Sequence, residues 1–158
     1  MRVIDVERVV PAPIEEVFAF MTSTDGYRQM FGVLRADVVR PGPREPGGAG
    51  SLREIVLPLL KLTELVEVYE PPTFMRYRII GSIPPLRHEH GFMTFTEESG
   101  GTRVHWHSEF AIASPVLSGP LTVLAKPLFR AGFRALLYTA ARILPARNSS
   151  SGATAADR

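Results

Sequence analysis

The chain has 158 residues, of which 45% are hydrophobic and 22% are charged, a composition typical of a single soluble globular domain. It contains no cysteine, which excludes disulfides, thiolate catalysis and cysteine-ligated metals. The formal net charge is only +2 and the basic residues are scattered, so we expect no nucleic-acid partner. The sequence lacks an uncharged apolar run of ~18 residues and its first residues are charged, so we expect a cytoplasmic protein without a membrane span.

The first part of the chain predicts one strand and two short helices. Residues 2–10 alternate in polarity, as the two sides of a strand do. The helix that follows opens with Pro13 in its first turn and with Glu15 and Glu16 near the positive end of the helix dipole. A second short helix is predicted to run through Phe31.

The middle of the chain predicts six more strands in succession. Most are joined by short connections such as Pro71-Pro72, so neighbouring strands should pair as antiparallel hairpins. The exception is the segment 41–50, which is rich in proline and glycine and has no capacity for regular structure. The predicted strands are Val33–Arg40, Ser51–Leu57, Lys61–Glu70, Phe74–Gly81, Arg87–Glu98 and Thr102–Ala113.

Residues 118–144 predict one long amphipathic helix, which at ~1.5 Å per residue is about as long as a small domain is wide. Lys126, Arg130 and Arg134 form a charged stripe along it, and Pro127 should bend or break it because proline lacks the backbone N–H. The apolar face opposite the stripe is predicted to hold Leu121, Ala125, Leu128, Phe129, Gly132, Leu136, Ala140 and Ile143.

Three segments carry a family resemblance: Val6–Met21 (VERVVPAPIEEVFAFM), Glu67–Ile79 (EVYEPPTFMRYRI) and Ser99–Phe110 (SGGTRVHWHSEF). With this order of elements, the chain resembles the START-like superfamily, also called the SRPBCC or helix-grip fold, and within it the polyketide cyclase/dehydrase and lipid-transport group. The resemblance implies an α+β fold in which a curved, seven-stranded antiparallel sheet grips the C-terminal helix, with two short helices between the first and second strands. The domain should span 1–145, followed by a flexible tail, 146–158.

The resemblance also implies a cavity between sheet and helix, because many members hold an apolar ligand there. Ala125, Gly132 and Ala140 are small residues on the predicted inner face of the helix, and they would leave room for it. The loops 41–50 and Ser82–Pro85 should border the cavity mouth and be the least ordered connections before the tail.

The last hairpin predicts which residues face the helix. A tight turn pairs Met93 with Trp106 and Gly91 with Ser108, and the apolar side of this hairpin must face the core. That side carries Met93, Phe95, Val104, Trp106, Phe110 and Ile112. The same alternation places the four histidines outside, namely His88, His90, His105 and His107.

Two carboxylates break the inner apolar pattern. Glu64 and Glu89 fall on the inner face, where each could lie at a wet cavity mouth or could contact the ligand as an acid or base. The preceding hairpin places Leu62, Val66, Val68, Met75, Tyr77 and Ile79 inside. The strand 51–57 is ambiguous, because either Arg53, Ile55 and Leu57 or Leu52, Glu54 and Val56 could face inward.

The histidines form two His-x-His pairs, which raises the possibility of a metal site. Histidines two apart on a strand project to the same side, and zinc accepts imidazole ligands. Four histidines mixed with Thr94, Arg103 and Glu109 on an outward face are, however, more simply a polar surface. We therefore expect no metal and no cofactor.

The inner faces supply the candidate ligand-binding residues. They are Met75, Tyr77, Met93, Trp106, Ser108, Phe110, Leu128, Gly132 and Leu136. Few polar groups are predicted inside, which favours binding of an apolar or amphipathic molecule such as a lipid, sterol or polyketide over catalysis. The alternatives are an enzyme resembling polyketide cyclases and dehydrases, with Glu64 or Glu89 as the catalytic group, and a regulator that acts through an outer surface. A monomer and a homodimer both fit the sequence.

Overall fold

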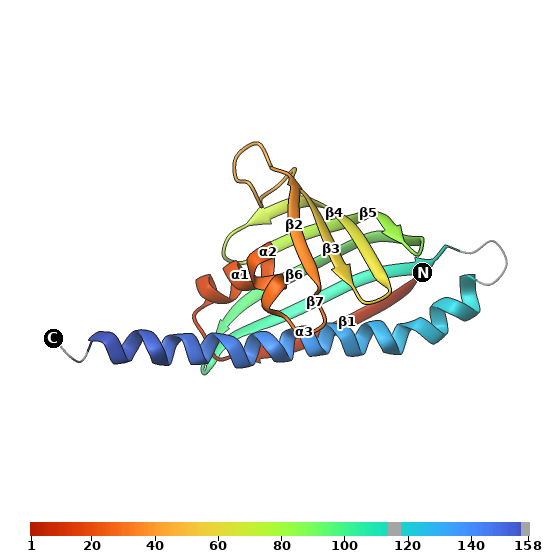
Figure 1. Cartoon of the computed structure of the whole chain (residues 1–158). Helices are drawn as coiled ribbons and strands as arrows, with labels where there is room; N and C mark the ends of the chain where they lie inside the picture. Colours follow the sequence, from red (N-terminus) through yellow and green to blue (C-terminus); the bar gives the residue numbers. More distant parts are fainter. Residues whose placement is uncertain (114–117, 156–158) are drawn as a thin grey trace.

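The computed structural model describes residues 1–113 and 118–155, which fold as an α+β structure (Figure 1). The long C-terminal helix lies across a curved sheet, and two short helices lie near one end of it. In chain order the elements are β1 (Arg2–Val10), α1 (Ile14–Thr22), α2 (Thr24–Gln29), β2 (Arg35–Arg40), β3 (Leu52–Leu57), β4 (Leu60–Glu70), β5 (Phe74–Ile83), β6 (Leu86–Glu98), β7 (Gly101–Ile112) and α3 (Ser118–Ala155). This order confirms the predicted helix-grip architecture.

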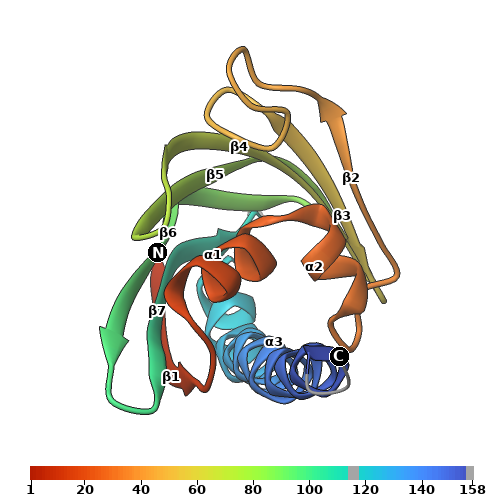
Figure 2. The same cartoon turned by 90° about the vertical axis from the view of Figure 1, so that its left-hand side faces the viewer.

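The sheet is seven-stranded in the order β1-β7-β6-β5-β4-β3-β2, and its neighbours pair antiparallel. Consecutive strands from β2 to β7 are joined as hairpins, and β1 completes the sheet by pairing with β7. Viewed along α3, the sheet curls around the helix and leaves α1 and α2 inside the curl (Figure 2). The core therefore lies between the concave face of the sheet and the helices.

The two short helices are fixed by local sequence. Pro13 precedes α1, and Glu15 and Glu16 lie in its first turn, where carboxylates complement the helix dipole. Ser23 is the N-cap of α2, and its hydroxyl accepts a hydrogen bond from the Gly26 N–H at 3.0 Å. Tyr27 of α2 is 3% exposed, so this short helix places an aromatic side chain inside the fold.

The long helix does not break at Pro127. It is continuous from Ser118 to Ala155, although its first turns bend away from the axis of the rest (Figure 1). The sequence predicted an end at Leu144 and a flexible tail, but α3 continues through Pro145 to Ala155 and projects beyond the sheet. The predicted boundary at residue 145 therefore does not coincide with the end of a secondary-structure element.

The inner face of α3 differs from the predicted one. Leu128 is 74% exposed and Gly132 is also exposed, so neither faces the sheet. Phe129 packs against the core as predicted, and Phe133 packs there in place of Leu128 and Gly132, because burying an aromatic ring removes a large apolar surface from water. The described residues that pack inward are Ala125, Phe129, Phe133, Leu136, Leu137, Ala140, Ala141, Ile143 and Leu144.

Candidate functional site

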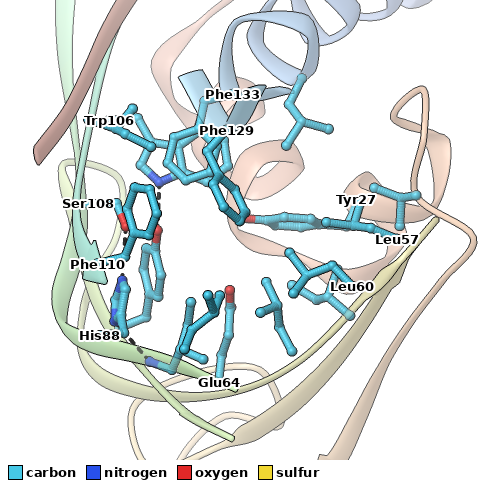
Figure 3. A pocket seen from close by; sticks show the side chains of 18 residues that line it. Tyr27, Leu57, Leu60, Glu64, His88, Trp106, Ser108, Phe110, Phe129 and Phe133 are labelled. Atoms are coloured by element: carbon cyan, nitrogen blue, oxygen red, sulfur yellow. Dashed lines mark hydrogen bonds between the residues drawn. The ribbon is translucent and has the colours of Figure 1, made fainter. Parts of the chain in front are cut away.

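A cavity lies between the concave face of the sheet and α3 (Figure 3). Its volume is about 60 Å³, measured as the space open to the centre of a water-sized sphere. That is several times the ~10–15 Å³ that one water needs on this measure, so the space is not ordinary packing imperfection. The cavity is lined by Ile4, Tyr27, Val33, Ile55, Leu57, Leu60, Leu62, Glu64, Tyr77, Ile79, Leu86, His88, Trp106, Ser108, Phe110, Phe129, Phe133 and Leu136.

The helix wall of the cavity is aromatic and aliphatic. Phe133 stacks on Trp106 with ring centroids 4.2 Å apart, and Phe129 meets Phe110 edge to face at 4.7 Å. Both pairs connect α3 to β7, so they determine which side of the helix faces the cavity. Such aromatic pairs stabilise a fold by ~0.5–1.5 kcal/mol each beyond the area that they bury.

The sheet wall carries a buried histidine, His88, which is 8% exposed. Its Nδ1 accepts a hydrogen bond from the Ile79 backbone N–H at 3.1 Å. Nε2 therefore carries the proton of the neutral ring and donates to Ser108 Oγ at 2.9 Å. Burial, followed by the nearby His90, lowers the pKa of His88 to about 4, so the ring is neutral at physiological pH.

The position of His88 corrects the prediction that all four histidines face outward. The β6–β7 register shifts between His88 and Gly91, where β6 holds one residue more than β7. On the N-terminal side of Gly91, which includes His88 and Glu89, this bulge reverses the predicted alternation of β6, because a one-residue slip moves each side chain to the opposite face. The same slip explains why Glu89, predicted to face inward, is exposed and does not line the cavity.

A buried ion pair forms the second polar cluster of the sheet wall. Arg53 and Glu64 are register partners on β3 and β4, and Arg53 Nη2 donates to Glu64 Oε2 at 2.8 Å. Arg53 is 1% exposed, and its Nη1 also donates to the Thr22 carbonyl at 2.6 Å. Within the described part of the chain, Arg53 Nε has no hydrogen-bond partner. Arg53 and Ile55 are thus inward residues of β3, which settles the ambiguous strand. The Glu64 side chain is buried and its carboxylate points into the cavity (Figure 3).

Two buried tyrosines connect these clusters to the aromatic wall. The Tyr77 hydroxyl accepts a hydrogen bond from Trp106 Nε1 at 2.8 Å, and the Tyr77 ring stacks on His88 at 5.5 Å. The Tyr27 hydroxyl points into the cavity, and its ring lies 5.5 Å from the Arg53 guanidinium carbon (Figure 3). Burial, followed by the Glu64 carboxylate, raises the pKa of both tyrosines, so both hydroxyls stay protonated.

A glycine makes room for Tyr77. A Cβ added at Gly91 would lie 2.4 Å from Tyr77 Cζ and 2.6 Å from its hydroxyl oxygen. Any side chain at this position of β6 would therefore displace the tyrosine that holds Trp106. Gly91 also marks the end of the bulge that turns His88 inward, so one short stretch of β6 shapes this side of the cavity.

The structure brings together some of the predicted site residues and separates others. Tyr77, Trp106, Ser108, Phe110, Leu136 and Glu64 line the cavity. Met75 and Met93 are buried in the core but are not part of the cavity wall. Leu128, Gly132 and Glu89 are exposed.

Sequence reasoning missed several residues of the cavity. The main ones are Tyr27, Leu60, His88 and Phe133, whereas Leu57 belonged to one of the two alternatives left open for its strand. A signal for Phe133 was present, since the spacing Phe129, Phe133, Leu136 and Ala140 is itself a helical stripe. No comparable signal marks His88, because its position depends on a bulge that sequence alternation does not show.

The predicted cavity-mouth loops lie in different places. The segment Ser82–Pro85, which holds the end of β5 and its connection to β6, precedes Leu86, which lines the cavity. Ser82 Oγ accepts a hydrogen bond from the Leu86 N–H at 2.7 Å. The loop 41–50 provides none of the described cavity residues and lies beside Tyr69, whose side chain is 3.5 Å from the Cβ position of Gly48. It therefore does not border this cavity. Its predicted mobility stays a prediction.

Comparisons with known proteins agree with this architecture. Residues 1–144 match the family model described as polyketide cyclase / dehydrase and lipid transport. The chain belongs to this family. No curated protein matches the sequence. Among the described residues, no helix combines the length and the apolar character needed to span a membrane.

Several solved structures share the fold at low sequence identity. A protein from Thermus thermophilus is 22% identical, with a TM-score of 0.77, over 92% of this chain and 99% of that one. A START superfamily protein from Mycobacterium smegmatis is 10% identical, with a TM-score of 0.73, over 90% and 97%. DynU16, from the dynemicin biosynthetic locus, is 19% identical with a TM-score of 0.65, and the match spans 90% of this chain and 47% of DynU16. At these identities the likeness shows the fold alone.

Proposed function

We propose that this protein binds an apolar or amphipathic small molecule, of lipid, sterol or polyketide type, in the cavity between the sheet and α3, and that it does so without turning it over. The observation that carries the proposal is the composition of the cavity wall. Most of the residues lining it are aliphatic or aromatic, and among the few polar ones Glu64, His88, Ser108, Tyr77 and Trp106 each make at least one hydrogen bond. Such a wall favours a ligand that is chiefly apolar.

The state of the polar groups favours binding over catalysis. Glu64 is tied to Arg53, and both ring nitrogens of His88 are hydrogen-bonded. A general acid or base must reach the reacting group at hydrogen-bond distance with a proton free to move. His88 cannot meet that condition without breaking an existing contact, and Glu64 has one carboxylate oxygen held by Arg53. The family description, which includes lipid transport, is consistent with a carrier or sensor.

The single tryptophan makes binding measurable. Trp106 lines the cavity, so titration with fatty acids, sterols and aromatic polyketides should change its fluorescence for at least one class. Leu62→Phe, which adds a ring to the cavity wall, should weaken the change about tenfold or more, since a filled pocket loses its ligand. Leu128→Phe is the matched control, because the same substitution at a residue 74% exposed leaves the cavity untouched.

Three outcomes would contradict the proposal. If no class of ligand perturbs Trp106, or if Leu62→Phe and Leu128→Phe bind equally well while both remain folded in a thermal melt, the cavity is not a binding site. If instead a polyketide is cyclised or dehydrated and Glu64→Gln stops the reaction, the protein is an enzyme of the kind that its family description names.

A further inference from the structure

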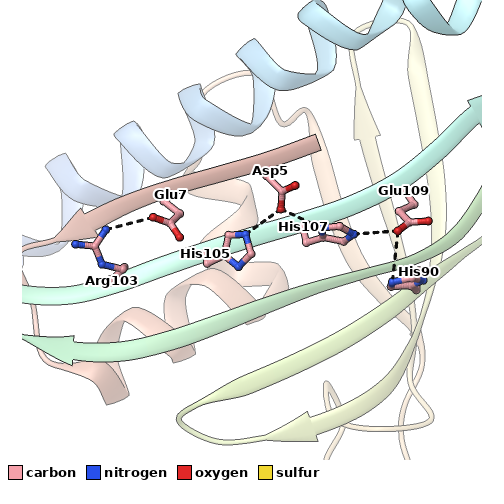
Figure 4. Close-up of polar contacts among 7 residues, drawn as sticks. All are labelled: Asp5, Glu7, His90, Arg103, His105, His107 and Glu109. Atoms are coloured by element: carbon pink, nitrogen blue, oxygen red, sulfur yellow. Dashed lines mark hydrogen bonds and ion pairs between the residues drawn. The ribbon is translucent and has the colours of Figure 1, made fainter. Parts of the chain in front are cut away.

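The outer face of the sheet holds a cluster of imidazoles and carboxylates that the cavity does not use (Figure 4). Trp106 and Ser108 of β7 point into the cavity, so the alternate residues His107 and Glu109 point away from α3. His90 of β6 lies beside them, because the bulge that turns His88 inward leaves His90 outside. We propose that His90, His107 and Glu109 bind a divalent transition-metal ion, with zinc as the expected ion.

The ligand atoms are close to the spacing that zinc requires. One ring nitrogen of His90, one of His107 and a carboxylate oxygen of Glu109 all lie within 4.8 Å of one another. Zinc–ligand bonds of about 2.0–2.2 Å place tetrahedral ligand atoms roughly 3.3–3.5 Å apart. His107 Nε2 and Glu109 Oε1 are already 3.3 Å apart, and His90 Nε2 is 4.0 Å from the same oxygen. The His90 side chain is 38% exposed and its ring stacks on that of His107 with centroids 5.7 Å apart, so closing the remaining gap requires a rotation of His90.

The hydrogen bonds of His107 also favour a metal. Its Nδ1 lies 2.9 Å from Asp5 Oδ1, and its Nε2 faces Glu109 Oε1. A neutral imidazole has only one N–H, so it cannot donate to two carboxylates at once. In the neutral tautomer whose proton lies on Nδ1 and is directed at Asp5, the lone pairs of Nε2 and of the Glu109 oxygen would face each other. A metal ion between them turns this repulsion into coordination.

Asp5 has the place of an outer-shell partner. A histidine that ligates a metal commonly donates its other N–H to a carboxylate, which fixes the tautomer and the orientation of the ring. Asp5 on β1 does this for His107 across the β1–β7 pair, in which the two residues are register partners. Phe92 stacks on His107 at 4.7 Å with an interplanar angle of 13°, which further restricts the ring.

The proposed ligand set differs from the pairs that stand out in the sequence. Sequence reasoning considered the pairs His88/His90 and His105/His107 and favoured a polar surface without metal. In the folded sheet His88 is inside, and His105 Nε2 is directed at Asp5 Oδ1 at 2.9 Å. The proposed set instead combines His90 of β6 with His107 and Glu109, which lie two residues apart on the neighbouring strand β7. Two imidazoles and one carboxylate are a ligand set that zinc accepts, with water in the fourth position.

Zinc binding by the untagged full chain tests the proposal. Calorimetry near neutral pH should show about one zinc per chain, and cobalt should bind with the visible absorption of a tetrahedral site. His90→Ala, His107→Ala and Glu109→Gln should each weaken binding more than tenfold, and Asp5→Asn by about 10- to 100-fold. His105→Ala is the matched control, because its ring lies in the same row but outside the ligand set.

A measurement on the unmodified protein covers the case in which a variant unfolds. In a zinc titration followed by NMR, the imidazole signals of His90 and His107 should shift together while those of His88 stay in place. The proposal fails if the protein takes up no stoichiometric zinc, if His90→Ala and His107→Ala bind as well as the unmodified chain, or if His105→Ala has the largest effect. In each of those cases the cluster is a set of ion pairs on an exposed sheet. None of these outcomes depends on the cavity on the opposite face.

Discussion

The two walls of the cavity are built on different physical principles. The sheet wall is held by directional contacts: Arg53 to Glu64, His88 to Ser108, and Trp106 to Tyr77. The described residues that α3 adds to the wall, Phe129, Phe133 and Leu136, are all apolar and pack through ring stacking and van der Waals contact.

The difference in contact type gives the two walls different roles. Directional contacts lose their energy steeply with displacement, whereas apolar contacts tolerate sliding and repacking. The sheet wall therefore defines where polar atoms of a ligand can lie. On the proposed function, we expect the helix wall to adapt more readily than the sheet wall to ligands of different size. Breaking the sheet wall should cost much stability, and trimming the helix wall should cost less and act mainly on ligand fit.

The largest effect is expected at Arg53. Arg53→Met removes one partner of a buried ion pair and leaves the Glu64 carboxylate without compensation, which should cost about 3–5 kcal/mol in the free energy of unfolding. Urea denaturation followed by Trp106 fluorescence measures this. The double variant Arg53→Met/Glu64→Leu should recover most of the loss, because a buried pair replaced by apolar groups of similar size is often neutral. A single variant as stable as the parent would show that the pair is solvated in solution.

A somewhat smaller effect is expected from protonation of His88. Its folded pKa of about 4 lies below the ordinary value of 6.5, so between these values the unfolded chain binds more protons than the folded one. The stability contributed by the neutral ring is then fully present above pH 6.5 and is lost as the pH falls towards 4, by up to about 3 kcal/mol.

The difference between two pH profiles isolates this effect, since other groups titrate in the same range. His88→Gln keeps an acceptor for Ile79 and a donor for Ser108 but cannot titrate, so its unfolding free energy should fall less than that of the parent between pH 6.5 and 4. Parallel profiles for the two proteins would mean that His88 titrates normally. NMR titration of the imidazole gives an independent value.

The fold could be predicted from the sequence because its signals are repeated. Hairpin turns, alternation and one long amphipathic segment each agree with the same topology, and the seven strands, the order of elements and the position of Trp106 inside all follow from them. Inner residues of the last hairpin were correct wherever the alternation runs unbroken, as for Phe95, Val104 and Phe110.

The site could be predicted only in part, because polarity alternation and helical periodicity reveal neither a β-bulge nor the exact rotation of a helix. The bulge between His88 and Gly91 exchanged the faces of His88 and Glu89, and a second shift between Val66 and Val68 turns Tyr69 rather than Val68 towards the core. Each slip is a single residue, and each inverts every assignment beyond it. The Arg53–Glu64 pair was missed because a strand with polar residues on both faces gives alternation no preference.

The smallest effect is expected on the helix wall, where two leucines give a matched pair. Leu136 is 8% exposed and lines the cavity, and Leu128 is 74% exposed. Leu136→Ala should cost about 2 kcal/mol, near the low end for a buried leucine, because one side of this residue already faces open space. Leu128→Ala should cost less than about 0.5 kcal/mol.

The same pair separates stability from ligand fit. Leu136→Ala enlarges the cavity from the helix side without touching a hydrogen bond, so it should admit bulkier ligands and change the Trp106 response, whereas Leu128→Ala should leave both unchanged. Urea denaturation and fluorescence titration on the two variants give both readouts. If Leu128→Ala proves the more damaging of the two, α3 is rotated in solution towards the face that the sequence first predicted, and the helix wall would then be lined by Leu128 and Gly132 beside Phe129, with Phe133 turned away.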